Sequence, residues 1–131
     1  MTALRGAEII FYPTAIGYTS DQKSADDIAY ADSWNLVQRG HAIVNACYIA
    51  SVNRVGFEPS LESEKGIEFW GSSFVADPLG QIVAEAAEDQ EEILVCPVDR
   101  TAVEEIRNKI AFPFRDRRVD SYAEITELYL E

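Results

Sequence analysis

The fold of this chain is constrained most by two short segments, residues 7–12 and 47–55, that are apolar on both faces. Strands of this kind are typical of a sheet that is covered on each side, because neither face favours contact with water. We therefore expect two buried strands, the first stopped by Pro13 and the second by Gly56. Each strand requires a pairing partner and cover on both faces.

A helix is expected between the two strands, over residues 32–46. Its larger side chains recur at spacings of three and four, which predicts one packed face. The residues of that face are Trp34, Val37, His41 and Val44. Gly40 lies inside the segment and weakens a helix by about 1 kcal/mol relative to alanine. We therefore expect packing against a neighbouring element to hold this helix in place.

A second helix is expected from Asp99 onward, because Thr101 and Glu104 have the spacing of a capping box. Residues 112–114, Phe-Pro-Phe, are expected to end it, since proline cannot continue a helix. A chain of 131 residues has the length of a single domain.

The segments between the helices predict a hairpin, an excursion and a strand. Residues 73–86 predict a β-hairpin, since Asp77, Pro78 and Gly80 occupy the positions that a type I turn prefers. Residues 57–68 are rich in acids and are interpreted as a solvated excursion. Residues 91–98 predict a further strand.

The charge of the chain excludes several classes of partner. It carries 11 basic and 23 acidic side chains, a net charge of −12, which repels nucleic-acid phosphates and anionic membranes. No apolar run approaches the ~20 residues that span a bilayer, and the first residues lack the layout of a signal peptide. We expect no nucleic-acid partner, no membrane partner and a cytoplasmic location, which two distant cysteines favour.

Few side chains in the sequence could carry chemistry. Cys47 opens one apolar strand and Cys96 lies within another, so both are interpreted as buried thiols. His41 is the only histidine, and a catalytic pair with Cys47 is the alternative, which needs an activated thiolate. The spacing of His, Cys and acids matches no zinc or calcium site, and the glycines form no phosphate-binding loop. We expect no metal and no cofactor.

Five segments, taken in order along the chain, match the motifs of one protein family. They are residues 5–17 (RGAEIIFYPTAIG), 34–45, 52–56, 69–80 (FWGSSFVADPLG) and 114–118. In this order they resemble the nitrilase, or carbon–nitrogen hydrolase, superfamily, and they look most like its polyamine-pathway amidases. The resemblance implies half of an α-β-β-α sandwich, an α/β structure with a mixed β-sheet and two main helices.

The resemblance also implies that the catalytic residues are elsewhere. The family's cysteine nucleophile, glutamate base and lysine all lie upstream of the segment that this chain resembles. Residues 1–131 are therefore expected to be the C-terminal half of one hydrolase domain, with no catalytic residue and no activity alone. A non-catalytic remnant or interaction module of the same fold is the alternative, and an independent hydrolase using Cys47 is a third.

By resemblance, this half would contribute part of the wall of the substrate pocket. The substrate-binding residues are then Thr14, Ala15, Ile16, Asn53, Trp70, Gly71 and Ser72. A structural role is the alternative: Thr14 closing a turn, Asn53 pairing with backbone, or Trp70 packing. His41 is interpreted as a structural residue of its helix, near a subunit contact.

The expected partners follow from the incomplete sandwich. A small amide substrate would bind only in the complete enzyme. The strands at 7–12 and 47–55 would lack the cover of the other half, and exposed apolar strand edges promote association. We expect a homo-oligomer or a complex with a complementing N-terminal half.

Overall fold

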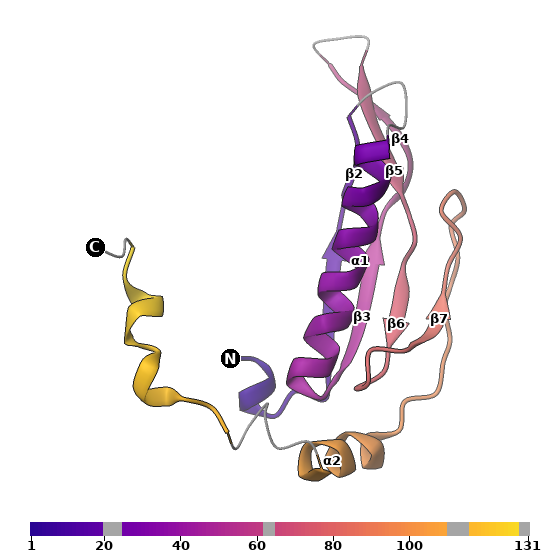
Figure 1. Cartoon of the computed structure of the whole chain (residues 1–131). Helices are drawn as coiled ribbons and strands as arrows, with labels where there is room; N and C mark the ends of the chain where they lie inside the picture. The colour runs from indigo at the N-terminus through magenta and orange to yellow at the C-terminus, as the bar shows by residue number, and fades with distance from the viewer. Residues whose placement is uncertain (20–24, 62–64, 110–115, 129–131) are drawn as a thin grey trace.

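The computed structural model describes residues 1–19, 25–61, 65–109 and 116–128 (Figure 1). Its elements, in chain order, are η1 (Ala3–Arg5), β1 (Ile9–Thr14), β2 (Gly17–Tyr18), α1 (Ala25–Asn45), β3 (Tyr48–Asn53), β4 (Val55–Pro59), β5 (Gly66–Trp70), β6 (Phe74–Ala76), β7 (Ile82–Glu85), α2 (Arg100–Lys109), η2 (Val119–Ser121) and η3 (Ala123–Thr126). One sheet has the order β1-β3-β6-β7 and a second has the order β2-β5-β4. β1 is parallel to β3 and the other pairs are antiparallel. The predicted α/β class, with a mixed sheet and two main helices, is confirmed.

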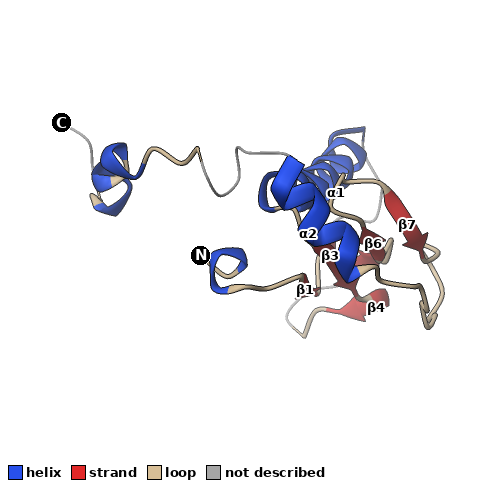
Figure 2. Ribbon diagram, turned by 90° about the horizontal axis from the view of Figure 1, so that it is seen from below, coloured by secondary structure: helices blue, strands red, loops and turns tan. Residues whose placement is uncertain are grey.

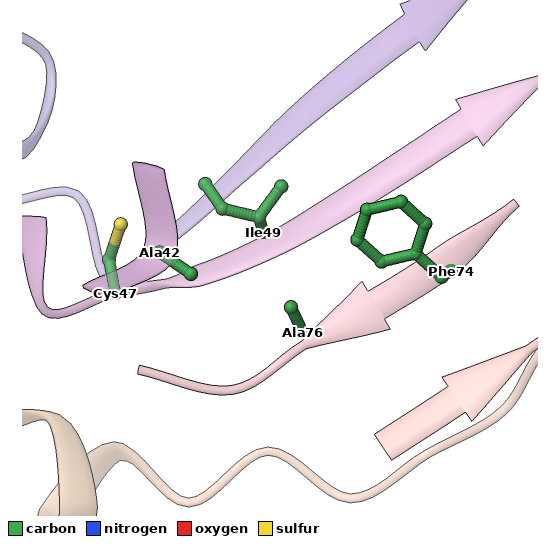
Figure 3. Packing of buried hydrophobic residues seen from close by; sticks show 5 residues of the cluster. All are labelled: Ala42, Cys47, Ile49, Phe74 and Ala76. Atoms are coloured by element: carbon green, nitrogen blue, oxygen red, sulfur yellow. The ribbon is translucent and has the colours of Figure 1, made fainter. Parts of the chain in front are cut away.

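The core lies between α1 and one face of the four-stranded sheet (Figure 3). Its fully buried residues are Ala42, Cys47, Ile49, Phe74 and Ala76. Ile10, Ile49 and Ala76 stand opposite one another on β1, β3 and β6, so their side chains share the face that α1 covers. The expected strand at 47–55 is therefore confirmed as the central, most buried strand.

α2 lies across the end of the sheet at which β1 and β3 begin, while α1 covers one side (Figure 2). Its first amides are capped by Asp99, whose Oδ1 accepts hydrogen bonds from Thr101 N at 2.9 Å and Ala102 N at 3.3 Å. The predicted start is confirmed, but the cap is Asp99 instead of the expected pair of Thr101 and Glu104. The expected end at 112–114 lies outside the described residues.

Two arginines of α2 tie it to the rest of the chain. The Arg107 guanidinium donates one hydrogen bond to Ala46 O, just after the end of α1, at 3.1 Å. It donates a second to Ala7 O, just before β1, at 2.6 Å. Arg100 forms an ion pair with Glu8, which lowers the pKa of the Glu8 carboxyl chiefly through the hydrogen bond that Arg100 donates. These contacts fix α2 against the start of the sheet.

The predicted face of the first helix is wrong except for Trp34. Val37 and Val44 are 56% and 50% exposed, whereas Gln38 and Ala42 are buried. The buried residues and Trp34 are spaced by four, and the small side chain of Ala42 fits where α1 contacts the core. The prediction was wrong because it placed the larger valines at the contact, whereas close packing of a helix on a sheet favours a small residue there.

The helix also begins earlier than the predicted residue 32. α1 starts at Ala25 and has Asp26 and Asp27 in its first turn. Carboxylates at this end interact favourably with the positive end of the helix dipole. His41 is exposed, and its ring makes an edge contact with Tyr12; its place near a subunit contact stays a prediction.

Three predictions about strands need correction. β1 continues through Pro13, because an end strand of a sheet tolerates the missing N–H of proline. The expected excursion at 57–68 is wrong at both of its ends, where β4 and β5 form an antiparallel pair whose charged side chains face solvent; residues 62–64 lie outside the described residues. Residues 91–98 form no strand, and Ile93 and Val95 are 92% and 88% exposed.

The hairpin at 73–86 is confirmed by the pairing of β6 and β7. In its turn Gly80 N donates to Asp77 O at 2.8 Å, and Asp77 Oδ1 accepts from Leu79 N and Gln81 N. Gly80 has φ +74°, which glycine adopts without strain.

The second face of the four-stranded sheet is only partly covered within the described chain: Tyr48 and Ala50, which alternate with Ile49 on β3, are buried there, but other residues are not. Ile10 and Tyr12 point toward α1, so alternation places Phe11 on the opposite face, where it is 66% exposed. Val52 of β3 is 48% exposed. The expectation that both early strands need further cover is consistent with these exposures. None of the described helices is long and apolar enough to cross a membrane.

Candidate functional site

Asn53, at the end of β3, organises the loop that follows β1. Its Nδ2 donates to Ile16 O at 3.0 Å and its Oδ1 accepts from Ile16 N at 3.0 Å. The Thr14 hydroxyl lies 3.1 Å from Asn53 Oδ1 and 3.1 Å from Val52 O, so its proton is directed at this pair of acceptors. Asn53 is 7% exposed. One buried amide therefore satisfies both backbone groups of Ile16.

The backbone of Asn53 is bound in turn by Ser73. Asn53 N donates to Ser73 Oγ at 2.9 Å, and Ser73 Oγ donates to Asn53 O at 3.2 Å. Residues 14–17 and 71–73 are thus linked through one residue. We call the contacts of Asn53 with Thr14, Ile16 and Ser73 the Asn53 clamp.

The turn before β6 is held in an unusual conformation. Gly71 and Ser72 have φ of +54° and +53°, in the left-handed region that favours glycine. Gly71 N donates to Arg54 O at 3.1 Å, and Ser72 Oγ donates to Trp70 O at 3.0 Å. A Cβ at Gly71 would lie 2.5 Å from Glu88 O, so a side chain there would displace backbone. The turn requires glycine for space as well as for conformation.

Trp70 joins the second sheet to α1. It is 4% exposed, and its ring centroid lies 5.1 Å from Tyr18, 6.1 Å from Trp34 and 6.2 Å from Tyr30. Aromatic pairs at these separations stabilise a core beyond their buried area. Trp70 and Ser72 also border a cavity of about 160 Å³, together with three carboxylates. These are Asp32, Glu85 and Glu88.

A larger and mainly apolar groove of about 490 Å³ lies between β1 and α1; we call it the β1–α1 groove. Its lining residues are Tyr12, Pro13, Thr14, Tyr30, Ser33, Trp34, Val37, Gln38 and His41. Tyr12 Oη lies 3.3 Å from His41 Nδ1, and burial raises the pKa of the Tyr12 hydroxyl. The Oε1 atom of Gln38 is buried and has no hydrogen-bond partner.

The structure arranges the seven expected site residues in two groups. Hydrogen bonds join Thr14, Ile16 and Asn53 directly, and Ala15 lies between the first two. Trp70, Gly71 and Ser72 form the second group, connected to Asn53 through Ser73. The structural alternatives for Asn53 and Trp70 are also observed, since Asn53 pairs with backbone and Trp70 packs. Their contact with substrate stays a prediction.

Two residues of this region were missed by sequence reasoning. Ser73 lies inside the motif at 69–80, so its neighbours there could have pointed to it. Gln38 lies on a helix face that the larger apolar side chains did not mark, and its sequence context carried no comparable signal.

The buried thiol interpretation of Cys47 is confirmed. Cys47 is fully buried in the core, and burial raises the pKa of its thiol more than nearby Arg107 lowers it. A raised pKa reduces the thiolate that a nucleophile requires. Cys96 is partly exposed, so its expected full burial is wrong. Among the described residues, His, Cys, Asp and Glu side chains form no group of three able to hold a metal.

The motifs and the fold both point to one family. The family model described as carbon-nitrogen hydrolase matches residues 1–108. The chain belongs to the carbon–nitrogen hydrolase family. The crystal structure of a carbon–nitrogen hydrolase from Helicobacter pylori G27 is similar, with a TM-score of 0.91 and 40% identity. That match covers 98% of this chain and 44% of the H. pylori chain.

Curated members of the carbon–nitrogen hydrolase family are similar over nearly the whole chain. N-carbamoylputrescine amidase of Arabidopsis thaliana is 43% identical over 122 residues, 91% of this chain and 39% of the relative. Citrullinase of Francisella tularensis is 35% identical over 127 residues, 97% of this chain and 42% of the relative. The chain therefore spans about two-fifths of the length of these relatives.

Proposed function

We propose that this chain is the C-terminal half of a carbon–nitrogen hydrolase resembling N-carbamoylputrescine amidase. It supplies a wall of the substrate pocket and turns over no substrate until a complementing polypeptide adds the nucleophile. The observation that carries the proposal is the Asn53 clamp, which holds residues 14–17 at the ends of β1 and β3. Cys47 precedes β3 at its other end, about 20 Å away along a six-residue strand, and so is not positioned to react there.

In the complete enzyme, the chemistry would be that of a cysteine amidohydrolase. The thiolate attacks the carbamoyl carbon of N-carbamoylputrescine, the bond to the terminal amide nitrogen breaks, and that nitrogen takes a proton and leaves as ammonia. Water then adds to the thioester carbon and the thiolate departs. The resulting carbamate loses carbon dioxide and leaves putrescine. The scheme requires no metal and no cofactor.

The charge of the chain supports an amine-bearing substrate. A net charge of −12 raises the local concentration of cations, including protonated diamines. The carboxylates of Asp32, Glu85 and Glu88 lie around the cavity that Trp70 and Ser72 border. Negative potential close to an expected pocket wall is consistent with a cationic alkyl tail.

An assay of ammonia release from N-carbamoylputrescine tests the proposal. The chain would be measured alone and after covalent fusion behind the upstream part of the A. thaliana enzyme. We expect no ammonia from the chain alone and clear turnover from the chimera. Turnover by the chain alone would overturn the proposal, and its loss in Cys47→Ser would assign the activity to that thiol.

The same chimera distinguishes the proposal from the alternative, a non-catalytic remnant of the same fold. A folded chimera without turnover favours the remnant, provided that the intact A. thaliana enzyme is active under identical conditions. An active chimera in which Asn53→Ala lowers turnover more than Asn45→Ala supports a pocket wall organised by the clamp. Asn45 is a suitable control because, among the described residues, its amide bonds to His41 O alone, within α1.

A further inference from the structure

The hydrogen-bonded ladder between β3 and β6 stops before β3 ends. Its last pair joins Ser51 to Phe74. β3 continues to Asn53 and remains paired with β1 to its end, where Thr14 stands opposite Asn53. Backbone N–H and C=O groups in a buried strand require partners on both sides. The last residues of β3 therefore need another source of hydrogen bonds on the side of β6.

The turn at Gly71 and Ser72 is the reason that the ladder stops. Continued by two residues, the register of β3 with β6 would place Ser72 opposite Asn53. Ser72 has φ +53°, outside the extended range of a strand, and its N donates to Ala87 O at 3.3 Å. The N–H of Ser72 is therefore used elsewhere, and the regular ladder position at Asn53 is left open in the described sheet.

The hydroxyl of Ser73 fills this position. It accepts a hydrogen bond from Asn53 N at 2.9 Å and donates one to Asn53 O at 3.2 Å. A residue of an antiparallel strand offers an acceptor and a donor in the same way, through its C=O and its N–H. A serine hydroxyl can do both, because it has one O–H and two lone pairs. One side chain thus replaces a strand partner for Asn53.

We propose that Ser73 is a positioning residue of the substrate pocket, which acts through Asn53 on residues 14–17. The inference rests on the proposed function, in which these residues form part of the pocket wall. Ser73 fixes the backbone of Asn53, and the Asn53 amide bonds in turn to Ile16 N and Ile16 O, each at 3.0 Å. Loss of the Ser73 hydroxyl should therefore loosen Ile16 through Asn53.

The chimera with the upstream part of the A. thaliana enzyme tests this role in turnover. A wall that holds substrate without touching the reacting bond contributes equally to ground-state and transition-state binding, so its loss raises KM and leaves kcat unchanged. We expect Ser73→Ala to raise the KM for N-carbamoylputrescine at least fivefold, with kcat within twofold of wild type. Ser73→Thr keeps the hydroxyl and should restore KM to within twofold.

Two further variants complete the series. Ser121→Ala is the matched control, since the Ser121 hydroxyl donates to Arg118 O at 2.8 Å at an exposed position of η2, and it should change neither constant. Ser73→Cys covers the case in which Ser73→Ala does not fold. Its thiol fills the space but is a weak donor and a weak acceptor, so KM should still rise.

Hydrogen exchange on the full chain alone gives a readout that does not depend on turnover. Ile16 N donates to Asn53 Oδ1, whereas Tyr48 N donates to Glu8 O at 2.8 Å, at the opposite end of β3. We expect Ser73→Ala to accelerate exchange at Ile16 N at least tenfold and to leave Tyr48 N unchanged. Ser73→Thr should restore the protection. Equal acceleration at both amides would indicate a general loss of stability and overturn the positioning role.

The kinetics separate failure of the inference from failure of the proposed function. An active wild-type chimera in which Ser73→Ala or Ser73→Cys leaves KM unchanged, or in which Ser73→Thr is as impaired as Ser73→Ala, overturns the inference alone. A wild-type chimera without turnover, while the intact A. thaliana enzyme is active, contradicts the proposed function and with it the pocket role of Ser73.

Discussion

Replacement of Asn53 by alanine is the sharpest test of the clamp. The change deletes both hydrogen bonds to Ile16, each 3.0 Å long, and the contact with Thr14. A net contribution of about 1 kcal/mol per bond, plus the cost of leaving partly buried partners unpaired, gives a loss of about 2–3 kcal/mol. At about 4 °C per kcal/mol for a chain of this size, the thermal midpoint should fall by roughly 10 °C.

Urea unfolding followed by tryptophan fluorescence would measure this loss, with Asn45→Ala as the matched control. Asn45 makes one local hydrogen bond, to His41 O, so its loss should cost about 0.5 kcal/mol or less. Hydrogen exchange at Ile16 N should accelerate only in Asn53→Ala. A stability within 0.5 kcal/mol of wild type, or protection of Ile16 N that does not change, would refute the clamp.

Asn53→Asp adds a pH signature to the same site. A carboxylate there would face Ile16 O, to which Asn53 donates, and burial would raise the pKa of the introduced carboxyl above about 3.9. Below pH about 3.9 the introduced acid is protonated in the folded and the unfolded state, and its O–H can donate to Ile16 O. The variant should then approach wild-type stability. As pH rises from 4 toward the raised folded pKa, stability is lost at about 1.4 kcal/mol per unit. A penalty independent of pH between 4 and 8 would contradict this reasoning.

Three further predictions follow from groups outside the clamp. Arg107→Met removes both charge-assisted hydrogen bonds to backbone carbonyls and should cost about 3 kcal/mol in urea unfolding, whereas Lys109→Met, at an exposed ion pair, should cost less than about 1 kcal/mol. Arg100 lowers the pKa of the Glu8 carboxyl, so the ionised carboxyl stabilises the fold above its unfolded pKa of about 4.3. This stabilisation is lost as pH falls through the pKa of the folded state. Glu8→Gln should therefore flatten that part of the stability–pH profile. Cys47 should resist thiol-labelling reagents until the chain is denatured, because its thiol is buried and its pKa is raised; rapid native-state labelling would contradict its place in the core.

Local patterns predicted the elements whose signals are contained within a few residues. The β6–β7 hairpin depends on a turn in which Gly80 N donates to Asp77 O and Asp77 Oδ1 accepts from Leu79 N, and the sequence of that turn predicts the bend directly. The start of α2 is similarly encoded by Asp99. β4 and β5 could not be recognised in this way, because each is only five residues long and includes a glutamate, and the segment that joins them in the sequence is rich in acids.

In the candidate site, too, some features could be predicted from the sequence and others depend on tertiary contacts. The motifs predicted that Thr14, Ile16 and Asn53 belong to one site, although Asn53 lies 39 positions from Thr14 and 37 from Ile16. The bonds themselves depend on the parallel register that places Thr14 opposite Asn53, and local periodicity does not encode such a register. The buried position of Gln38 depends likewise on how α1 is rotated against the sheet.

The exposure of the early strands connects the fold to its proposed role. Both were expected to need cover on two faces, and α1 covers only one, which leaves Phe11 and Val52 partly in water. Covering about 400 Å² of such apolar surface would contribute about 10 kcal/mol, as much as the whole stability of many domains. A polypeptide that binds the folded half at a hundred times its Kd stabilises it by about 2.7 kcal/mol through mass action alone. Folding and assembly are therefore expected to be coupled, because the surfaces that would complete the pocket are also the surfaces whose burial would complete the core.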